Sequence, residues 1–195
     1  MHKDVLIVAA LRDETGNHFE DRGIPVLYTG IGKVNAAYFL TLELAKLRIQ
    51  GQLPRAVINF GTAGSPVFET HQLVECTRFS QRDMDLSPLG FARGVTPFED
   101  TPSILEVPKR LHGLATGTCG TGDSFETGAA KVQCDVVDME AFALAKVCHL
   151  EGLPFLSVKY ISDGSDHNAH NDWNENLHRA AAGFIAVFGD ALAVI

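Results

Sequence analysis

The chain has 195 residues, of which 46% are hydrophobic and 21% are charged, and its formal net charge at pH 7 is −8. This length suits one compact domain, so we expect a single domain over residues 1–195. The acidic balance, without any cluster of lysine or arginine, excludes nucleic acid as the expected partner and favours a small molecule.

Cysteine usage and hydropathy indicate a cytoplasmic protein. The four cysteines lie far apart without a C-x-x-C pair, and no secretory leader precedes the first apolar run, so we expect reduced thiols. Each of the longest apolar runs is interrupted by Lys, Asp or Gly before it reaches the roughly 20 residues that span a bilayer. We therefore expect no association with membranes.

Strand-like and helix-like segments alternate along the chain. Runs rich in β-branched residues predict buried strands over residues 5–8, 56–60, 135–138 and 155–161. Apolar residues at steps of three and four predict helices over residues 34–48, 139–150 and 173–193. This alternation indicates an α/β fold whose mostly parallel sheet is covered by helices on both faces.

The segment 81–109 has a different character. It contains four prolines and no sustained period, which predicts a long surface loop. Loops of this length tend to be binding loops, lids or disordered segments, so Phe91, Arg93 and Phe98 are candidates for covering a site or contacting another subunit.

Two glycine motifs follow predicted strands, where ligands of such sheets bind. Gly30-Ile31-Gly32 is not a dinucleotide fingerprint, because Asn35 stands where the third glycine belongs, nor a phosphate loop, because Val34 follows the lysine. It is either a plain turn at a helix start or a turn that binds anions or hydroxyls. The motif at residues 61–64 either lets the backbone approach a ligand or is an ordinary turn.

Carboxylates follow two further strands. In Asp138-Met139-Glu140, a strand end passes directly into a helix, and Glu140 is either a ligand contact or a first-turn residue that favours the helix dipole. Asp163 ends a very apolar strand, where desolvation favours the protonated form that a general acid needs. The alternative for Asp163 is a turn former or helix cap.

Metal-dependent and serine-nucleophile chemistry are both disfavoured. Asp163, Asp166, His167, His170 and Asp172 lack the spacing of a metal site, so we expect a polar loop and no metal. The chain also has no G-x-S-x-G elbow of the kind that presents a catalytic serine.

Together these segments resemble the purine nucleoside phosphorylase and nucleosidase superfamily, and most closely its methylthioadenosine/S-adenosylhomocysteine nucleosidases. The similar segments are the loop ending in Glu14, T-G-I-G-K-V (29–34), N-F-G-T-A-G (59–64), T-G-D-S-F (121–125), V-D-M-E-A (137–141) and I-S-D (161–163). D-M-E-A and I-S-D are the most specific of them. The resemblance covers most of the chain outside residues 81–109, and it implies a single-domain, three-layer fold with a mostly parallel, mixed central sheet between helices.

The resemblance also implies roles for the matching residues. Asp163 donates a proton to N7 of a purine and Glu14 holds the attacking water, while Glu140 accepts hydrogen bonds from the ribose hydroxyls. Met139 packs on the sugar and Phe125 stacks on the base. The other implied substrate contacts are Thr62, Ala63, Gly64, Ser162 and Trp173, the last at the apolar wall around the 5′ substituent. No cofactor is implied.

The implied activity is hydrolysis of the N-glycosidic bond of a purine nucleoside, with methylthioadenosine, adenosylhomocysteine and adenosine all open as substrates. Phosphorylases of the superfamily surround phosphate with arginines, one of which precedes the turn that is N-F-G-T (59–62) here. The absent arginine and Glu14 favour water, whereas Arg12 keeps phosphorolysis as an alternative. A nucleoside-binding protein without activity is a third interpretation, because a fold does not establish activity.

The same resemblance predicts a homodimer or a larger homo-oligomer. Relatives complete their pocket from a neighbouring subunit, and Phe91 and Phe98 lie in the segment that differs most from the family's usual pattern.

Overall fold

The computed structural model describes residues 4–124, 133–163 and 169–195, without the side chains of residues 169–175, 177 and 178. Its strands are β1 Val5–Ala9, β2 Val26–Tyr28, β3 Ala56–Gly64, β4 Leu73–Gln81, β5 Ile104–Glu106, β6 Ala115–Thr121, β7 Val136–Asp138 and β8 Phe155–Asp163. Its α-helices are α1 Arg12–Thr15, α2 Lys33–Ile49, α3 Ala141–Glu151 and α4 Ala169–Val194, and short 3₁₀ turns cover Glu20–Arg22 and Ser87–Leu89.

All eight strands belong to one mixed sheet with the order β2-β1-β3-β7-β6-β4-β5, in which β8 pairs with both β3 and β4. The pairs β1–β2, β1–β3, β3–β8, β4–β6 and β6–β7 are parallel, and β3–β7, β4–β5 and β4–β8 are antiparallel. Because β3, β8, β4, β6 and β7 pair in a closed circuit, the middle of the sheet curls on itself.

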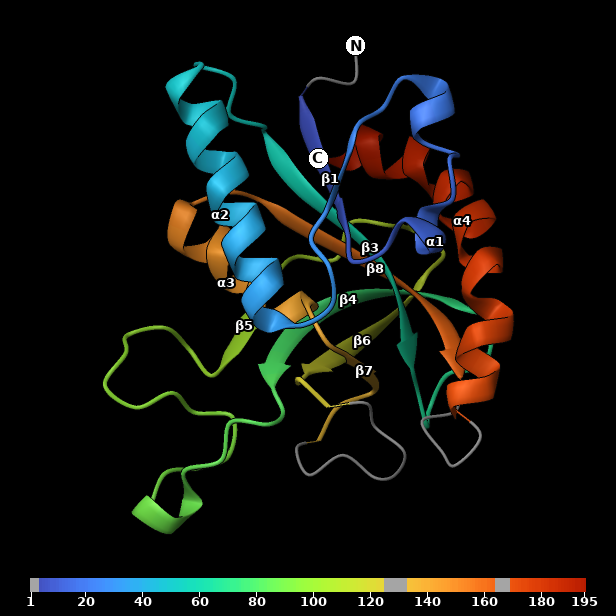
Figure 1. Ribbon diagram of the computed structural model, residues 1–195. Coiled ribbons are helices and arrows are strands. Elements are labelled where there is room, and N and C mark those ends of the chain that lie inside the picture. The colour runs from blue at the N-terminus through green and yellow to red at the C-terminus, as the bar shows by residue number, and fades with distance from the viewer. Residues whose placement is uncertain (1–3, 125–132, 164–168) are drawn as a thin grey trace.

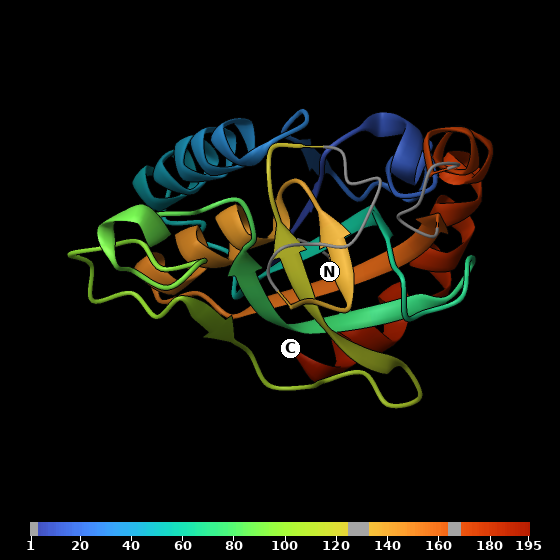
Figure 2. The ribbon, with the colours of Figure 1, turned by 90° about the horizontal axis from the view of Figure 1, so that it is seen from below.

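Helices cover the sheet on two sides. Both views place α2 and α3 on one side of the strands and α1 and α4 on the other (Figures 1 and 2). Leu40 and Leu44 of α2 and most of α3 pack in one buried apolar cluster, and Phe184 and Phe188 of α4 pack in a second around Phe60. The predicted α/β class, with a mixed sheet between helices, is confirmed.

The structure contains strands that apolar patterning did not predict. β4 (L-V-E-C-T-R-F-S-Q) and β6 (A-T-G-T-C-G-T) carry many polar residues and glycines, which are poor strand formers. Their conformation is set by pairing with each other over residues 74–81 and 115–121. The segment 81–109 is mostly irregular, as expected, but β5 within it adds to the edge of the sheet beside β4.

No helix among the described residues is long and apolar enough to cross a membrane.

Three of the four cysteines, Cys76, Cys119 and Cys148, are buried and form no disulfide.

Candidate active site

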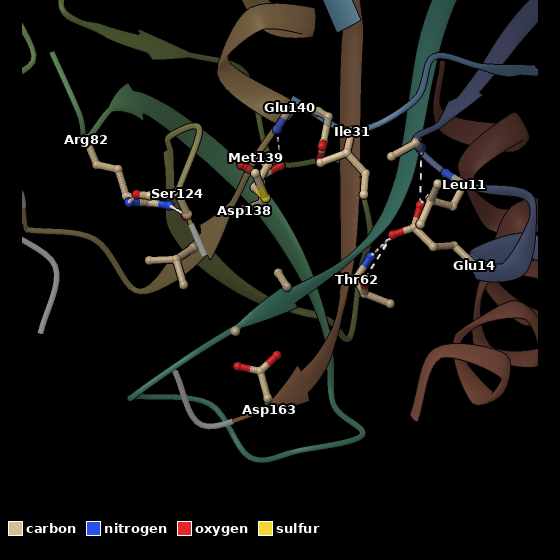
Figure 3. Close-up of a pocket in the computed structure, with 14 residues that line it drawn as sticks. Leu11, Glu14, Ile31, Thr62, Arg82, Ser124, Asp138, Met139, Glu140 and Asp163 are labelled. Atoms are coloured by element: carbon tan, nitrogen blue, oxygen red, sulfur yellow. Dashed lines mark hydrogen bonds between the residues drawn. The ribbon is translucent and has the colours of Figure 1, made fainter. Parts of the chain in front are cut away.

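A cavity of about 210 Å³ lies where the carboxyl ends of seven strands approach one another. Its walls are formed by residues that end or follow β1, β2, β3, β4, β6, β7 and β8, including Ile31 at the start of α2 (Figure 3). The lining residues are Ala10, Leu11, Glu14, Ile31, Thr62, Ala63, Gly64, Arg82, Ser124, Val137, Asp138, Met139, Glu140 and Asp163. The strand ends thus surround a cavity at the place where sheets of this class bind their ligands.

Glu14 is held rigidly at one wall by four hydrogen bonds. Its Oε1 accepts from the backbone N–H of Thr62 at 2.8 Å and from the Thr62 hydroxyl at 2.9 Å. Its Oε2 accepts from the N–H groups of Ala10 at 3.2 Å and Leu11 at 3.0 Å. These four hydrogen bonds fix the position of a carboxyl group that is only 4% exposed.

A buried ion pair lies beneath the cavity. Lys159, in the middle of β8 and 1% exposed, places its Nζ 2.8 Å from Asp138 Oδ2 at the end of β7. Burial opposes ionisation of Asp138, but Lys159 and hydrogen bonds from Thr121 and Ala141 hold the pKa of its carboxyl below the ordinary value. Burial likewise opposes the charge of Lys159, yet Asp138 raises the pKa of the ammonium above its ordinary value.

Glu140 is a buried carboxyl group with a very different environment. It lies two residues after Asp138, and its Oε1 accepts the backbone N–H of Gly32 at 2.8 Å. Burial raises the pKa of Glu140 to about 8, and the neighbouring charges of Asp138 and Glu14 add to the shift against the opposing effect of Lys159. Glu140 therefore changes its charge close to neutral pH.

Asp163 ends β8, and its carboxyl group points into the cavity from a different side than Glu14 (Figure 3). The residue is only 3% exposed. Ser162 lies behind it: the Ser162 hydroxyl donates to Asp163 Oδ2 at 2.8 Å and reaches the carbonyl of Ala63 at 3.3 Å. The carboxyl group is thus oriented by its own neighbour in the chain.

Arg82, which follows β4, brings a cation to the cavity wall. Its guanidinium donates to the hydroxyl of Ser124 at 3.0 Å, to the carbonyl of Gly122 at 3.2 Å and to the carbonyl of Ser124. These hydrogen bonds fix the turn after β6, so Arg82 positions the wall that Ser124 contributes.

A second polar cluster fixes the start of α2 beside the cavity. Asp123 Oδ1 accepts the backbone N–H of Lys33 at 2.8 Å, and Lys33 Nζ lies 2.6 Å from Asp83 Oδ1. The glycine turn before α2 therefore binds the carboxylates of Asp123 and Glu140 with its free amides, which is the anion-binding use of a helix start.

Most of the residues singled out from the sequence meet at this cavity. Asp163, Glu14, Glu140, Met139 and Thr62 line it, together with Ala63 and Gly64. Ser162 is fully buried behind Asp163. Phe125 lies outside the described residues; Trp173 lies in α4, and its side chain is not described.

Lys159 and Arg82 are two residues of the site that were not predicted from the sequence. For Lys159 a signal was present, because a lysine within the apolar run 155–161 has to find a partner when it is buried. Arg82 gave no such signal, because β4, the strand that it directly follows, was not predicted. Of the suspected metal cluster, Asp166 and His167 lie outside the described residues, and the absence of a metal stays a prediction.

The comparisons with known proteins agree with this architecture. A model of the phosphorylase superfamily matches residues 14–193. The 5′-methylthioadenosine/S-adenosylhomocysteine nucleosidase of Actinobacillus succinogenes is 32% identical over 214 aligned residues, covering 93% of this chain and 90% of the relative. The enzyme of the same name from Geobacillus kaustophilus is 34% identical over 178 residues, covering 80% and 73%.

Solved structures share the fold. A mutant of futalosine hydrolase from Helicobacter pylori superimposes with a TM-score of 0.83 at 21% identity, covering 98% of this chain and 99% of that one. The 5′-methylthioadenosine/S-adenosylhomocysteine nucleosidase of the same organism, in complex with a pyrrolopyrimidine compound, gives a TM-score of 0.81 at 24% identity, with 96% of this chain and 97% of that one covered. With a family model matching nearly its whole length, the chain belongs to the phosphorylase superfamily.

Proposed function

We propose that this chain is a nucleosidase that hydrolyses the N-glycosidic bond of a purine nucleoside, releasing the free base and the ribose moiety. The observation that carries the proposal is the placement of Glu14 and Asp163, two buried carboxyl groups that line one cavity from different sides. Relatives that carry the name of methylthioadenosine/adenosylhomocysteine nucleosidases support it. The proposed substrate is a nucleoside of that kind or adenosine.

Cleavage of the bond requires help for the leaving base. Departure of a purine builds positive charge on the ribose ring and negative charge on the base, as in other glycosidic cleavages. Asp163 supplies a proton to N7 of the base, and the Ser162 hydroxyl at 2.8 Å stabilises the carboxylate that remains. The base then leaves as a neutral molecule.

The ribose lies on the side of the cavity away from Asp163, against Glu140, Met139 and Glu14. Glu140 accepts hydrogen bonds from the ribose hydroxyls and Met139 packs on the ring. Glu14 stabilises the positive charge that develops there, and Glu140 adds to this effect in its ionised form, above its pKa of about 8. Glu14, held in place by Thr62, Ala10 and Leu11, also orients the attacking water and receives its proton.

The same geometry favours water over phosphate. The N–H and hydroxyl of Thr62 are donors that a phosphate at this turn would need, and both already bind the carboxylate of Glu14. Arg12 is the residue whose presence in the sequence left phosphorolysis as an alternative. In the structure it pairs with Glu20 at 2.8 Å and lies over the ring of Tyr28. Phosphorolysis is therefore the less favoured alternative.

We further propose that two copies of the chain associate through the outer face of α2. Val34 and Tyr38 of α2 are 78% and 60% exposed, and Ile31, just before the helix, is 46% exposed, so apolar surface is concentrated at this end of α2. Because Ile31 also lines the cavity, this surface is continuous with the site. A second copy seated there would exclude water from the substrate.

We also propose that the protein is cytoplasmic, because buried free thiols such as Cys76 and Cys119 suit a reducing compartment.

Replacing either catalytic carboxyl group is expected to lower kcat far more than it raises KM. Asp163→Asn cannot supply the proton and Glu14→Gln cannot accept one, so each should lose about 10²–10⁴-fold in rate. The measurement is steady-state kinetics on accepted purine nucleosides. Glu75→Gln is the matched control, because Glu75 is a buried carboxylate that accepts the N–H groups of Arg110 and Leu111 outside the cavity. Near-parental kcat for Asp163→Asn would remove its role as the acid.

Glu140 gives the stability a specific pH dependence. Because the folded-state pKa of about 8 lies above the ordinary value of 4.5, folding binds a proton, and stability is lost as pH rises from 4.5 through 8. Glu140→Gln removes this loss, so its melting temperature at pH 9 should exceed the parental one by roughly 2–4 °C for each kcal/mol regained. At pH 4 the two proteins should differ much less. Parallel melting curves across this range would show that the Glu140 pKa is not raised.

Charge on α2 is expected to separate the two copies. Light scattering should give about twice the chain mass of 21.1 kDa for the parent and the single mass for Val34→Glu combined with Tyr38→Glu. Both side chains are exposed, so the monomer should remain folded by circular dichroism. A parent that stays monomeric at all concentrations contradicts the proposed interface.

A further inference from the structure

The end of β8 is irregular at the point where it delivers Asp163. Strands β3 and β8 pair regularly up to Ala63 and Ile161, but the next pair is Gly64 and Asp163, so β3 places no residue opposite Ser162. Ser162 is thus the extra residue of a β-bulge. Bulges bend a strand and are common beside active sites, where they direct a side chain that regular pairing would not.

Three consecutive carbonyl groups at this bulge are held by three different segments. The carbonyl of Ile161 accepts the backbone N–H of His71 at 2.8 Å, and that of Asp163 accepts the backbone N–H of Ser65 at 3.0 Å. Between them, the carbonyl of Ser162 accepts Nδ2 of Asn176 at 2.9 Å. Asn176 is the side-chain donor among the three, and it comes from helix α4.

The orientation of the Asn176 amide is fixed from its other end. Arg179, one turn later in α4, places Nη1 3.5 Å from Asn176 Oδ1 and 3.4 Å from His71 Nε2. Because an arginine only donates, it selects the amide orientation in which Nδ2 faces Ser162. His71, which adopts a left-handed φ of 75°, is held in turn by the Tyr160 hydroxyl 2.7 Å from its Nδ1.

The peptide group that Asn176 binds is the one that joins Ser162 to Asp163. A rotation of this peptide would move both the Asp163 carboxyl group and the Ser162 hydroxyl that donates to it. Asn176 is 7% exposed, so its hydrogen bond is protected from water. Loss of the bond leaves a buried carbonyl unsatisfied, and the peptide is then free to turn toward another donor.

We propose that Asn176 is a positioning residue for the general acid: its amide fixes the bulge at Ser162 and holds the Asp163 carboxyl group where it reaches N7 of the purine. This inference rests on the proposed function, because it assigns a support to the acid named there. Asn176 is not among the described residues that line the cavity. Its removal should therefore misplace the proton donor and leave substrate binding almost unchanged.

The test compares Asn176→Ala with Asn59→Ala. Asn59 is an equally buried amide that donates to the carbonyl of Val8 and accepts from the Ser157 hydroxyl, within the sheet and away from the cavity. Both changes should lower the melting temperature by similar amounts. Only Asn176→Ala should lower kcat on a purine nucleoside, by about 10–100-fold, because a small misplacement of a catalytic group costs this much, and its KM should change little.

A second substrate separates positioning of the acid from general damage. A 4-nitrophenyl riboside with the same 5′ group releases a phenolate that needs no protonation, so Asn176→Ala should cleave it at nearly the parental rate. Equal losses on both substrates, or a kcat on the purine nucleoside equal to that of Asn59→Ala, would overturn the inference. If the parent cleaves no purine nucleoside, the proposed function is overturned together with the inference. If Asp163→Asn is inactive but Asn176→Ala keeps the parental kcat on the purine nucleoside, the inference alone is overturned.

Discussion

The ion pair between Lys159 and Asp138 connects the core of the fold to the candidate site. An ammonium group that is 1% exposed is tolerated only with a close partner, and Asp138 Oδ2 lies 2.8 Å from it. Asp138 also accepts the N–H groups of Glu140 and Ala141 at the start of α3 and the hydroxyl of Thr121 at the end of β6. One carboxylate thereby fixes β6, β7, β8 and α3 relative to one another.

The same pair explains a glycine of the motif after β3. A Cβ atom at Gly61 would lie 3.0 Å from Lys159 Nζ and 3.6 Å from Glu14 Oε1, a tighter contact with the ammonium than side chains normally make. The backbone of β3 approaches the charged groups closely because this residue has no side chain. A side chain at Gly61 would therefore require the buried Lys159 ammonium or the strand to shift by a few tenths of an ångström.

The acidic side chains of the site have different environments and hence different protonation. Glu14 accepts four hydrogen bonds from neutral donors, and Asp138 is paired with Lys159, which holds the pKa of the Asp138 carboxyl below its ordinary value. Glu140 has one backbone donor and two acidic neighbours, and burial raises its pKa to about 8. When environments move the pKa values of neighbouring carboxyl groups apart in this way, one group can carry a proton while another carries a charge.

Much of this arrangement is predictable from sequence, and the remainder depends on contacts between distant segments. The apolar strands around Ile7, Ile58 and Leu156 follow from local patterning, and the motifs ending in Glu14, Glu140 and Asp163 do line one cavity. The strands β4 and β6 do not follow, because their polar and glycine-rich segments become strands only by pairing together. Arg82 and Asn176 were missed for the same reason: each acts on a backbone carbonyl that is distant in the sequence.

The central claim is that water, held by Glu14, attacks the ribose while Asp163 protonates the base. It is tested most directly by analysing the products of an accepted purine nucleoside in ¹⁸O-labelled water, with and without phosphate. The account predicts free purine and a ribose that carries one ¹⁸O at C1, formed at a rate that phosphate does not change. Formation of ribose 1-phosphate, or a reaction that proceeds only when phosphate is added, would contradict it.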